Sequence, residues 1–391
     1  MMKKLLYTLT ALLLPLMAAG ANPNDLYSQY KAGEDIKIGD LVVNKTTYPD
    51  AQLVAPEDLT FSGHISKGGL YFIDDKEGTG VANLSAKAVG RQSPAATATT
   101  PLIVIGRYKV DGKQTEIKVS EMRTRGDVAF MNVKLTAKQA AGESNSMFNM
   151  FAKNSSDQLS TAIRLQDCSV DNVAARNFIL DKQNEESAPY SKVMLDNCVV
   201  KLAREKGNFV IALYRCEGVV EDPTEFSVTN SVVYASAPAK YATVFHTTKN
   251  TPAKKLTLTG NSFVNLGGGQ GVVKHAVVES AAIGSNLIAL CFNAAVDLGY
   301  DSGKFIFSAT DEQPKLVSAG NNYIAIYGEA VYDSRPYEFG YWQFKSNKTD
   351  RIRRNDPFKT YNVENACFVV NPEVVTNGAG ASYETKYFVS K

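Results

Sequence analysis

Short stretches of alternating apolar and polar residues recur along the chain, and each ends in a small or polar pair. In residues 254–266, KKLTLTGNSFVNL, leucines alternate with polar residues, Gly260 and Asn261 follow, and the apolar Phe263 comes two positions later. Alternation with a period of two residues predicts a strand with one buried face. Glycine and asparagine tolerate left-handed backbone geometry, so the pair predicts a tight corner after the strand.

Seven copies of this pattern follow one another. They begin at Val128, Ile163, Val193, Phe226, Leu256, Ala281 and Val317, at intervals of 35, 30, 33, 30, 25 and 36 residues. Repeats of this length are typical of solenoids. A second strand-like stretch follows most of the corners, and no unit contains an amphipathic helix, which argues against helical and leucine-rich solenoids. We therefore expect an all-β chain folded as a parallel β-helix, with coils about 4.8 Å apart.

The residue just after each corner predicts what fills the bend. In chain order this column is Val133, Cys168, Cys198, Ser231, Asn261, Asn286 and Asn322. In a parallel β-helix these side chains stack inward, and stacked Asn amides hydrogen-bond along the stack. Cys168 and Cys198 are neighbours in the column, and we favour a reduced, packed pair over a disulfide.

The chain resembles right-handed parallel β-helix proteins of the pectate-lyase-like superfamily. Three features carry this resemblance: the stretch LTLTGNSFVNL, the polar column and the irregular repeat length. The closing stretch NDPFKTYNVENACFVV, residues 355–370, is similar to the end of secreted bacterial β-helix proteins without an established function. The resemblance implies a single-stranded right-handed β-helix. It says less about activity, because enzymes acting on acidic polysaccharides and several non-enzymes share this scaffold.

The chain divides into four expected segments. Residues 1–21 combine a short positive region, an apolar stretch and a small-residue cleavage signal, as a secretory signal peptide does. Residues 22–125 would form an N-terminal segment and irregular first coils, 126–330 the regular coils, and 331–391 an insertion with a closing coil or cap. We expect a monomer without an integral membrane segment, exported to the periplasm or to the outside of the cell.

Charge and metal-ligating residues limit the partners. The chain has 42 basic and 40 acidic residues, and loss of Lys3 and Lys4 with the signal peptide leaves 40 of each. A neutral chain argues against a nucleic-acid partner, which needs a basic excess. Three histidines and five cysteines fit no metal-site spacing. We expect no metal and no cofactor, with calcium entering only if the protein is a lyase.

The second strand of each unit carries the candidates for catalysis. On the first strands, two expected outward columns are mostly small and neutral: Arg164, Met194, Ser227, Thr257 and Ala282, and beside them Gln166, Asp196, Thr229, Thr259 and Gly284. Elimination on a uronic acid needs a base near the proton next to the carboxylate and positive charge to stabilise the enolate. His246 or Lys274 is the candidate base and Arg215 the carboxylate partner. The alternative is that these side chains are solvated or lie at coil ends.

A second candidate site lies in residues 332–358, which interrupt the rhythm of the coils and contain the only Trp. Aromatic faces stack on sugar rings, and a guanidinium group binds a carboxylate through two parallel hydrogen bonds. The candidate ligand-binding residues are Tyr337, Tyr341, Trp342, Arg351, Arg353 and Arg354. The alternative is that the aromatic residues cap the end of the solenoid.

Three functions remain open from the sequence. The leading hypothesis is recognition of a polysaccharide, with acidic polysaccharides among the candidates. The second is a polysaccharide lyase that acts on a uronic-acid-containing glycan without a familiar catalytic motif. The third is a structural or adhesive surface protein with no soluble glycan ligand.

Overall fold

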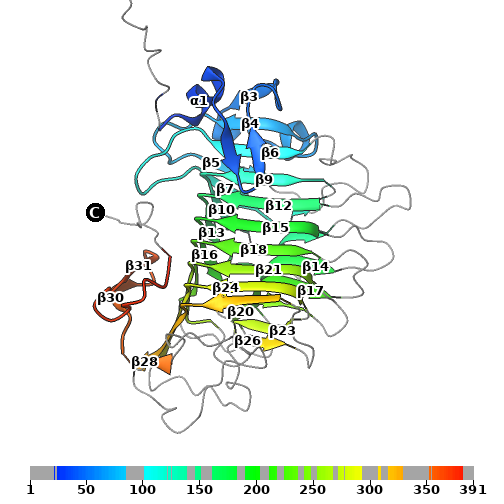
Figure 1. The fold of residues 1–391 in the computed structure, drawn as a ribbon. Helices are drawn as coiled ribbons and strands as arrows, with labels where there is room; N and C mark the ends of the chain where they lie inside the picture. The colour runs from blue at the N-terminus through cyan, green and yellow to red at the C-terminus, as the bar shows by residue number, and fades with distance from the viewer. Residues whose placement is uncertain are drawn as a thin grey trace, which may run out of the picture.

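The structure is a computed structural model. It describes residues 22, 24–84, 101–120, 122–124, 126–138, 146–150, 161–182, 190–202, 211–217, 224–236, 242–247, 253–266, 272–276, 278–292, 307–309, 316–328, 352–353 and 355–381. Within these ranges the chain is a parallel β-helix built from three long sheets, as the repeats predicted (Figure 1). No helix in the described part of the chain has the length and apolar content needed to cross a membrane.

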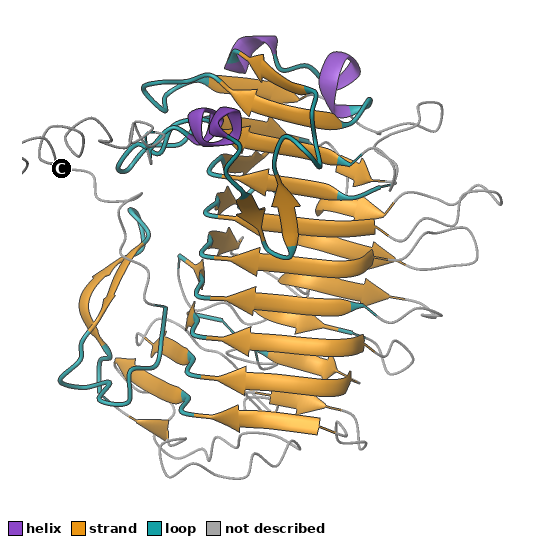
Figure 2. Cartoon of the chain, turned by 45° about the horizontal axis from the view of Figure 1, so that its top comes forward, coloured by secondary structure: helices purple, strands orange, loops and turns teal. Residues whose placement is uncertain are grey.

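From β6 (Leu102–Gly106) to β26 (Phe307–Ala309) the chain visits the three sheets in turn. The first sheet contains β3 (Ala51–Val54), β4 (Gly69–Ile73), β6 (Leu102–Gly106), β9 (Val128–Met131), β12 (Thr161–Gln166), β15 (Tyr190–Asp196), β18 (Glu225–Thr229), β21 (Ala253–Thr259), β24 (Val278–Gly284) and β27 (Leu316–Gly320). The second contains β5 (Val81–Leu84), β7 (Glu116–Val119), β10 (Lys134–Ala137), β13 (Ser169–Asp171), β16 (Val199–Leu202), β19 (Val232–Ala235), β22 (Ser262–Val264), β25 (Leu287–Phe292), β28 (Tyr323–Gly328) and β29 (Ile352–Arg353). The third contains β8 (Met122–Thr124), β11 (Ser146–Met150), β14 (Asn177–Lys182), β17 (Ile211–Glu217), β20 (Ala242–His246), β23 (Val273–Ala276) and β26 (Phe307–Ala309). Figure 2 shows the strands stacked as rungs.

The corner between the first and second sheets has the geometry that the sequence predicted. All seven corner residues have positive φ angles: Asn132, Asp167, Asn197, Asn230, Gly260, Ser285 and Asn321. The pairing register also confirms the two outward columns of the first sheet, because Arg164, Met194, Ser227, Thr257 and Ala282 are consecutive partners. The repeated phrase is therefore one rung of the solenoid.

The predicted polar column forms a buried hydrogen-bonded ladder. The side-chain oxygen of Asn322 accepts from the backbone and side-chain nitrogens of Asn286, at 3.1 and 3.0 Å. Asn286 accepts the same pair of bonds from Asn261, both at 3.0 Å, and donates to the carbonyl of Leu258. The ladder continues to Ser231, whose backbone nitrogen donates to Asn261. Every polar atom of these buried amides thus has a partner.

The two cysteines of the column are reduced and buried. The thiol of Cys168 donates to the carbonyl of Phe130 at 3.4 Å, and that of Cys198 to the carbonyl of Asp196 at 3.2 Å. Burial raises the pKa of the Cys198 thiol, and its contact with Cys168 raises it further. The two cysteines pack as small side chains without a disulfide, as predicted from the sequence.

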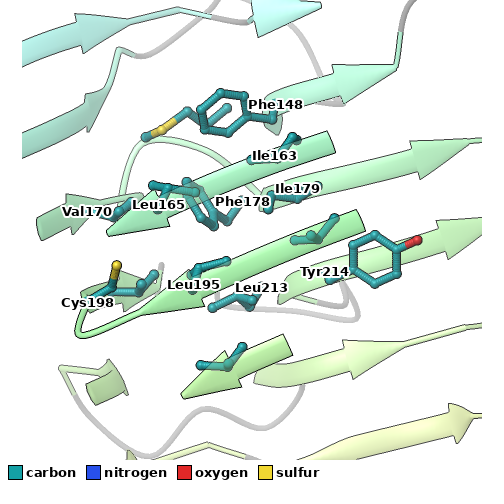
Figure 3. Packing of buried hydrophobic residues seen from close by; sticks show 14 of the residues in the cluster. Phe148, Ile163, Leu165, Val170, Phe178, Ile179, Leu195, Cys198, Leu213 and Tyr214 are labelled. Atoms are coloured by element: carbon teal, nitrogen blue, oxygen red, sulfur yellow. The ribbon is translucent and has the colours of Figure 1, made fainter. Parts of the chain in front are cut away.

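Inside the coils, aromatic rings fill the space between the sheets. Phe226 of the first sheet contacts Tyr214 and Phe245 of the third, with ring centroids 5.1 Å apart in both pairs. Tyr214 and Phe245 stack on neighbouring coils at 5.3 Å. Figure 3 shows the same packing in the coils before, where Phe178 lies beside Leu165. The core is therefore a continuous column rather than a central cluster.

The N-terminal segment covers the outer face of the first sheet. Helix α1 (Leu26–Ala32) begins at Asp25, whose carboxylate accepts from the backbone nitrogen of Ser28, and ends at Gly33 with φ 85°. The antiparallel hairpin of β1 (Ile36–Ile38) and β2 (Leu41–Val43) follows. Together they bury the apolar outward side chains of β4, β6 and β9, which are Leu70, Phe72, Ile103, Ile105, Ala129 and Met131.

Ion pairs fasten the hairpin to the next two coils. Asp40 binds Arg164 of β12 at 2.5 Å and Lys192 of β15 at 2.6 Å, and Arg164 also binds Asp127 at 3.1 Å. Burial by itself would raise the pKa of Asp40, but hydrogen bonds from Arg164 and Lys192 outweigh burial and hold the pKa at about 2. These ion pairs thus hold the hairpin on β12 and β15, where the outer surface of the first sheet becomes polar.

The C-terminal segment covers the outer face of the second sheet in the same way. Strands β30 (Phe358–Asn362) and β31 (Cys367–Val370) form an antiparallel hairpin. Its aromatic side chains pack on the outward residues of β16, β19, β22, β25 and β28, and Phe368 lies 5.0 Å from Tyr234. After the hairpin, Asn377 exchanges two hydrogen bonds with Asn321, which attach the C-terminal segment to a corner between the first and second sheets.

Replacing Asn286 with alanine tests the ladder. The change leaves the nitrogens of Asn261 and the carbonyl of Leu258 buried without these partners, so the free energy of unfolding should fall by roughly 3 kcal/mol. Urea unfolding measures it. The control is Asn230→Gly, at a corner where φ is 44° and glycine fits without strain; we expect a loss below about 1 kcal/mol there. An unchanged midpoint in Asn286→Ala would contradict the role of the ladder.

Acid should weaken the fastening of the N-terminal hairpin. Because the folded-state pKa of Asp40 lies below the unfolded value, its contribution is complete above about pH 4 and is lost as the pH falls toward 2. Asp40→Asn should therefore lower the urea midpoint slightly at pH 7 and have no effect near pH 2. If the urea midpoints of the native protein and Asp40→Asn differed by the same amount at both pH values, this assignment would be refuted.

Candidate functional site

The third sheet is the one bordered by long connections. The chain passes from β15 to β16 in two residues, Asn197 and Cys198. In contrast, residues 203–210 separate β16 from β17, and residues 293–306 separate β25 from β26. Long connections on a rigid scaffold are where binding and catalytic residues usually lie. A functional site is therefore expected on the strands of the third sheet.

The structure brings the three candidate catalytic residues into one column of this sheet. Arg215 of β17 pairs with His246 of β20, and His246 pairs with Lys274 of β23. We call these three residues the basic column. Consecutive strands lie about 4.8 Å apart, so the three residues occupy neighbouring rungs. The position before Arg215 in the same column is Leu180 of β14, which is buried.

Buried aromatic residues lie directly beneath the basic column. His246 is 7% exposed, and Arg215 is partly buried. The residues just before them, Tyr214 and Phe245, stack inside the coil with an interplanar angle of 12°. For Lys274, the structure describes the position of the backbone. The aromatic stack fixes the strands beneath the column, so the positions of Arg215 and His246 are set by the core.

The chemistry of the basic column suits anions. Arginine and lysine carry positive charge at neutral pH, and partial burial makes a charge interact more strongly than it does in water. A guanidinium group binds a carboxylate through two parallel hydrogen bonds. An imidazole beside such a group can take up a proton. An arginine and a histidine on neighbouring rungs are thus the residue types that carboxylate binding and proton uptake require.

The second predicted site lies almost wholly outside the described residues. This is true of Tyr337, Tyr341, Trp342, Arg351 and Arg354. Arg353 is described as part of β29, where it pairs with Ala325 of β28. Its backbone therefore extends the second sheet.

The two outward columns of β12 to β24 are mostly small and neutral, as predicted, but the sequence did not show what covers part of the sheet. Arg164 is held by Asp40 and Asp127, and Met194 lies against Gly39 of the hairpin. A signal for this cover exists in the continuous apolar run of 69–73, GLYFI, since a strand buried on both faces loses its alternation.

Comparison with protein-family models, with curated proteins and with solved structures finds no match to this chain. Across the ranges that the structure describes, no three His, Cys, Asp or Glu side chains gather as a metal site requires.

Proposed function

We propose that the chain binds an acidic polysaccharide, in the periplasm or outside the cell, and that carboxylates of the polymer meet the basic column. The observation that carries this proposal is the register of Arg215, His246 and Lys274 on three successive rungs. A repeating scaffold presents such groups at regular spacing, which suits a ligand that repeats.

Neutralising Arg215 tests the binding proposal. Arg215→Gln should weaken retention of an acidic polysaccharide about tenfold, because the variant loses the charge-assisted pair with a carboxylate. Affinity electrophoresis through gels containing polygalacturonate, alginate or a neutral glucan measures retention, with and without calcium. Retention of the native protein should fall as salt rises.

The matched control is Lys67→Gln, which removes an exposed positive charge at the N-terminal end of the solenoid. Circular dichroism checks that both variants are folded. Equal retention of native protein and Arg215→Gln would overturn the site assignment. No retention of the native protein in any acidic gel would favour the structural or adhesive alternative.

A polysaccharide lyase is the second candidate, and a specific observation favours it. His246 lies between Arg215 and Lys274 in the column, so a proton acceptor would stand between two groups able to neutralise a uronate. Such neutralisation lowers the barrier to removing the proton next to the carboxylate.

The lyase hypothesis predicts chain cleavage with formation of an unsaturated uronate. His246→Gln should abolish the rise in ultraviolet absorbance that this product causes, while retention of the polymer stays within about threefold of the native protein. Native protein that retains the polymer without raising the absorbance would be a binding protein. Cleavage undiminished in His246→Gln would remove His246 from the mechanism.

A further inference from the structure

One column of the third sheet holds buried polar side chains. The register pairs Ser146 of β11 with Asn177 of β14, and Ala212 of β17 with Thr243 of β20. Extending the register of β14 and β17 by two residues places Ala212 next to Asn177. We call these four residues the Ser146 column. They occupy consecutive rungs, and their exposed fractions lie between 0 and 3%.

The Ser146 column lies beside the apolar core rather than inside it. On each of its rungs the next two residues both belong to the core, as Leu213 and Tyr214 do after Ala212 (Figure 3). Two consecutive core residues interrupt the alternation of a strand, so the column ends where each strand bends. Ala212 itself is fully buried but does not join the cluster of apolar residues that the core forms.

Three oxygen atoms of this column have no partner within the described residues. They are Oγ of Ser146, Oδ1 of Asn177 and Oγ1 of Thr243. The amides of the corner ladder are the opposite case, since each of them is bonded to the next coil. Leaving a buried hydroxyl or amide oxygen without a hydrogen bond is unfavourable, and in native proteins such atoms are usually bonded to protein or to ordered water. Three of them in one column therefore indicate a bound hydrogen-bonding partner.

The position of Ala212 shows where that partner would lie. Asn177 and Thr243 carry polar atoms beyond Cβ, whereas the side chain of Ala212 between them ends at Cβ. Rungs about 4.8 Å apart keep Asn177 and Thr243 about 9.6 Å apart, too far for a direct hydrogen bond. A molecule on the Ala212 methyl group can reach both. It has to donate to Oδ1 of Asn177, which only accepts, and it can accept from the hydroxyl of Thr243.

Water meets these requirements. A water molecule donates and accepts at the same time, and buried waters typically make about three hydrogen bonds to otherwise unsatisfied polar groups. A metal cation would need several oxygen ligands around one point, and this column spreads its oxygens over four rungs.

We propose that the Ser146 column binds a file of internal waters. One water lies on Ala212 and bridges Asn177 to Thr243, and another lies between Ser146 and Asn177. The waters join β11 to β20 on the third sheet, as the Asn ladder joins the coils at the corner. This site goes beyond the proposed function and does not depend on it.

Oxygen-17 magnetic relaxation dispersion on the full chain tests the proposal, because its amplitude reports long-lived internal waters and excludes protein hydroxyl groups. Ala212→Ser places a hydroxyl on the rung of the bridging water and should displace it. The amplitude should therefore fall by the contribution of a single water. Ala282→Ser is the matched control on the outer face of the first sheet, where Ala282 is half-buried, and it should leave the amplitude unchanged.

Thr243→Val gives a second measurement, because valine keeps the shape of threonine and lacks its hydroxyl. Removing a hydroxyl that binds water should lower the midpoint of urea unfolding, whereas removing one that binds nothing should leave the midpoint unchanged or raise it. The control is Thr257→Val, at a half-buried threonine on the first sheet, which should shift the midpoint less. Circular dichroism checks that each variant is folded.

Two results would overturn the proposal. Equal relaxation amplitudes in the native protein and Ala212→Ser would show that no long-lived water lies on Ala212. A urea midpoint of Thr243→Val at or above the native value would show that its hydroxyl has no bonded water, and this measurement decides alone if Ala212→Ser does not fold. Arg215→Gln should leave the relaxation amplitude unchanged, so failure of this site and failure of the basic column are distinguishable.

Discussion

Backbone pairing between successive coils is the interaction on which the rest of this structure depends. A single coil has strands too short to be stable alone, and every strand becomes stable only when the next coil hydrogen-bonds to it. The buried amides of Asn261, Asn286 and Asn322 fix how one coil sits on the next, since each amide accepts from the same two nitrogens of its neighbour. Strand register, the aromatic column and the outward columns all follow from that alignment.

The regular part of the fold was readable from the sequence because its signals are local. Alternation, a left-handed corner and one inward residue recur within about ten residues, and the outward columns follow by aligning the copies. The covers of the two sheets were not readable. What Leu70 or Tyr234 packs against depends on segments far away in the chain, and no periodicity links Phe368 to Tyr234. Apolar runs show that a second face is buried without showing what buries it.

The candidate sites were predictable to different degrees. Arg215, His246 and Lys274 were singled out by residue type, but the sequence could not place them on one column. They are separated by 31 and 28 residues, and the connections between the third strands vary in length. Only the pairing of β17, β20 and β23 aligns them. The Ser146 column carried no signal in the sequence, because its members are ordinary small or polar residues that strand pairing alone aligns.

The two terminal segments also determine how the molecule would bear a mechanical load. The N-terminal segment reaches from β4 to β15, and the C-terminal hairpin from β16 to β28, each lying across five successive rungs. A tension applied between the ends of the chain would pull on these covers before it reached any rung of the solenoid. The covers would peel from the sheets one contact at a time, while the coils beneath kept their hydrogen bonds. Under such a load the two covers would act as a sacrificial layer that protects the repeating core.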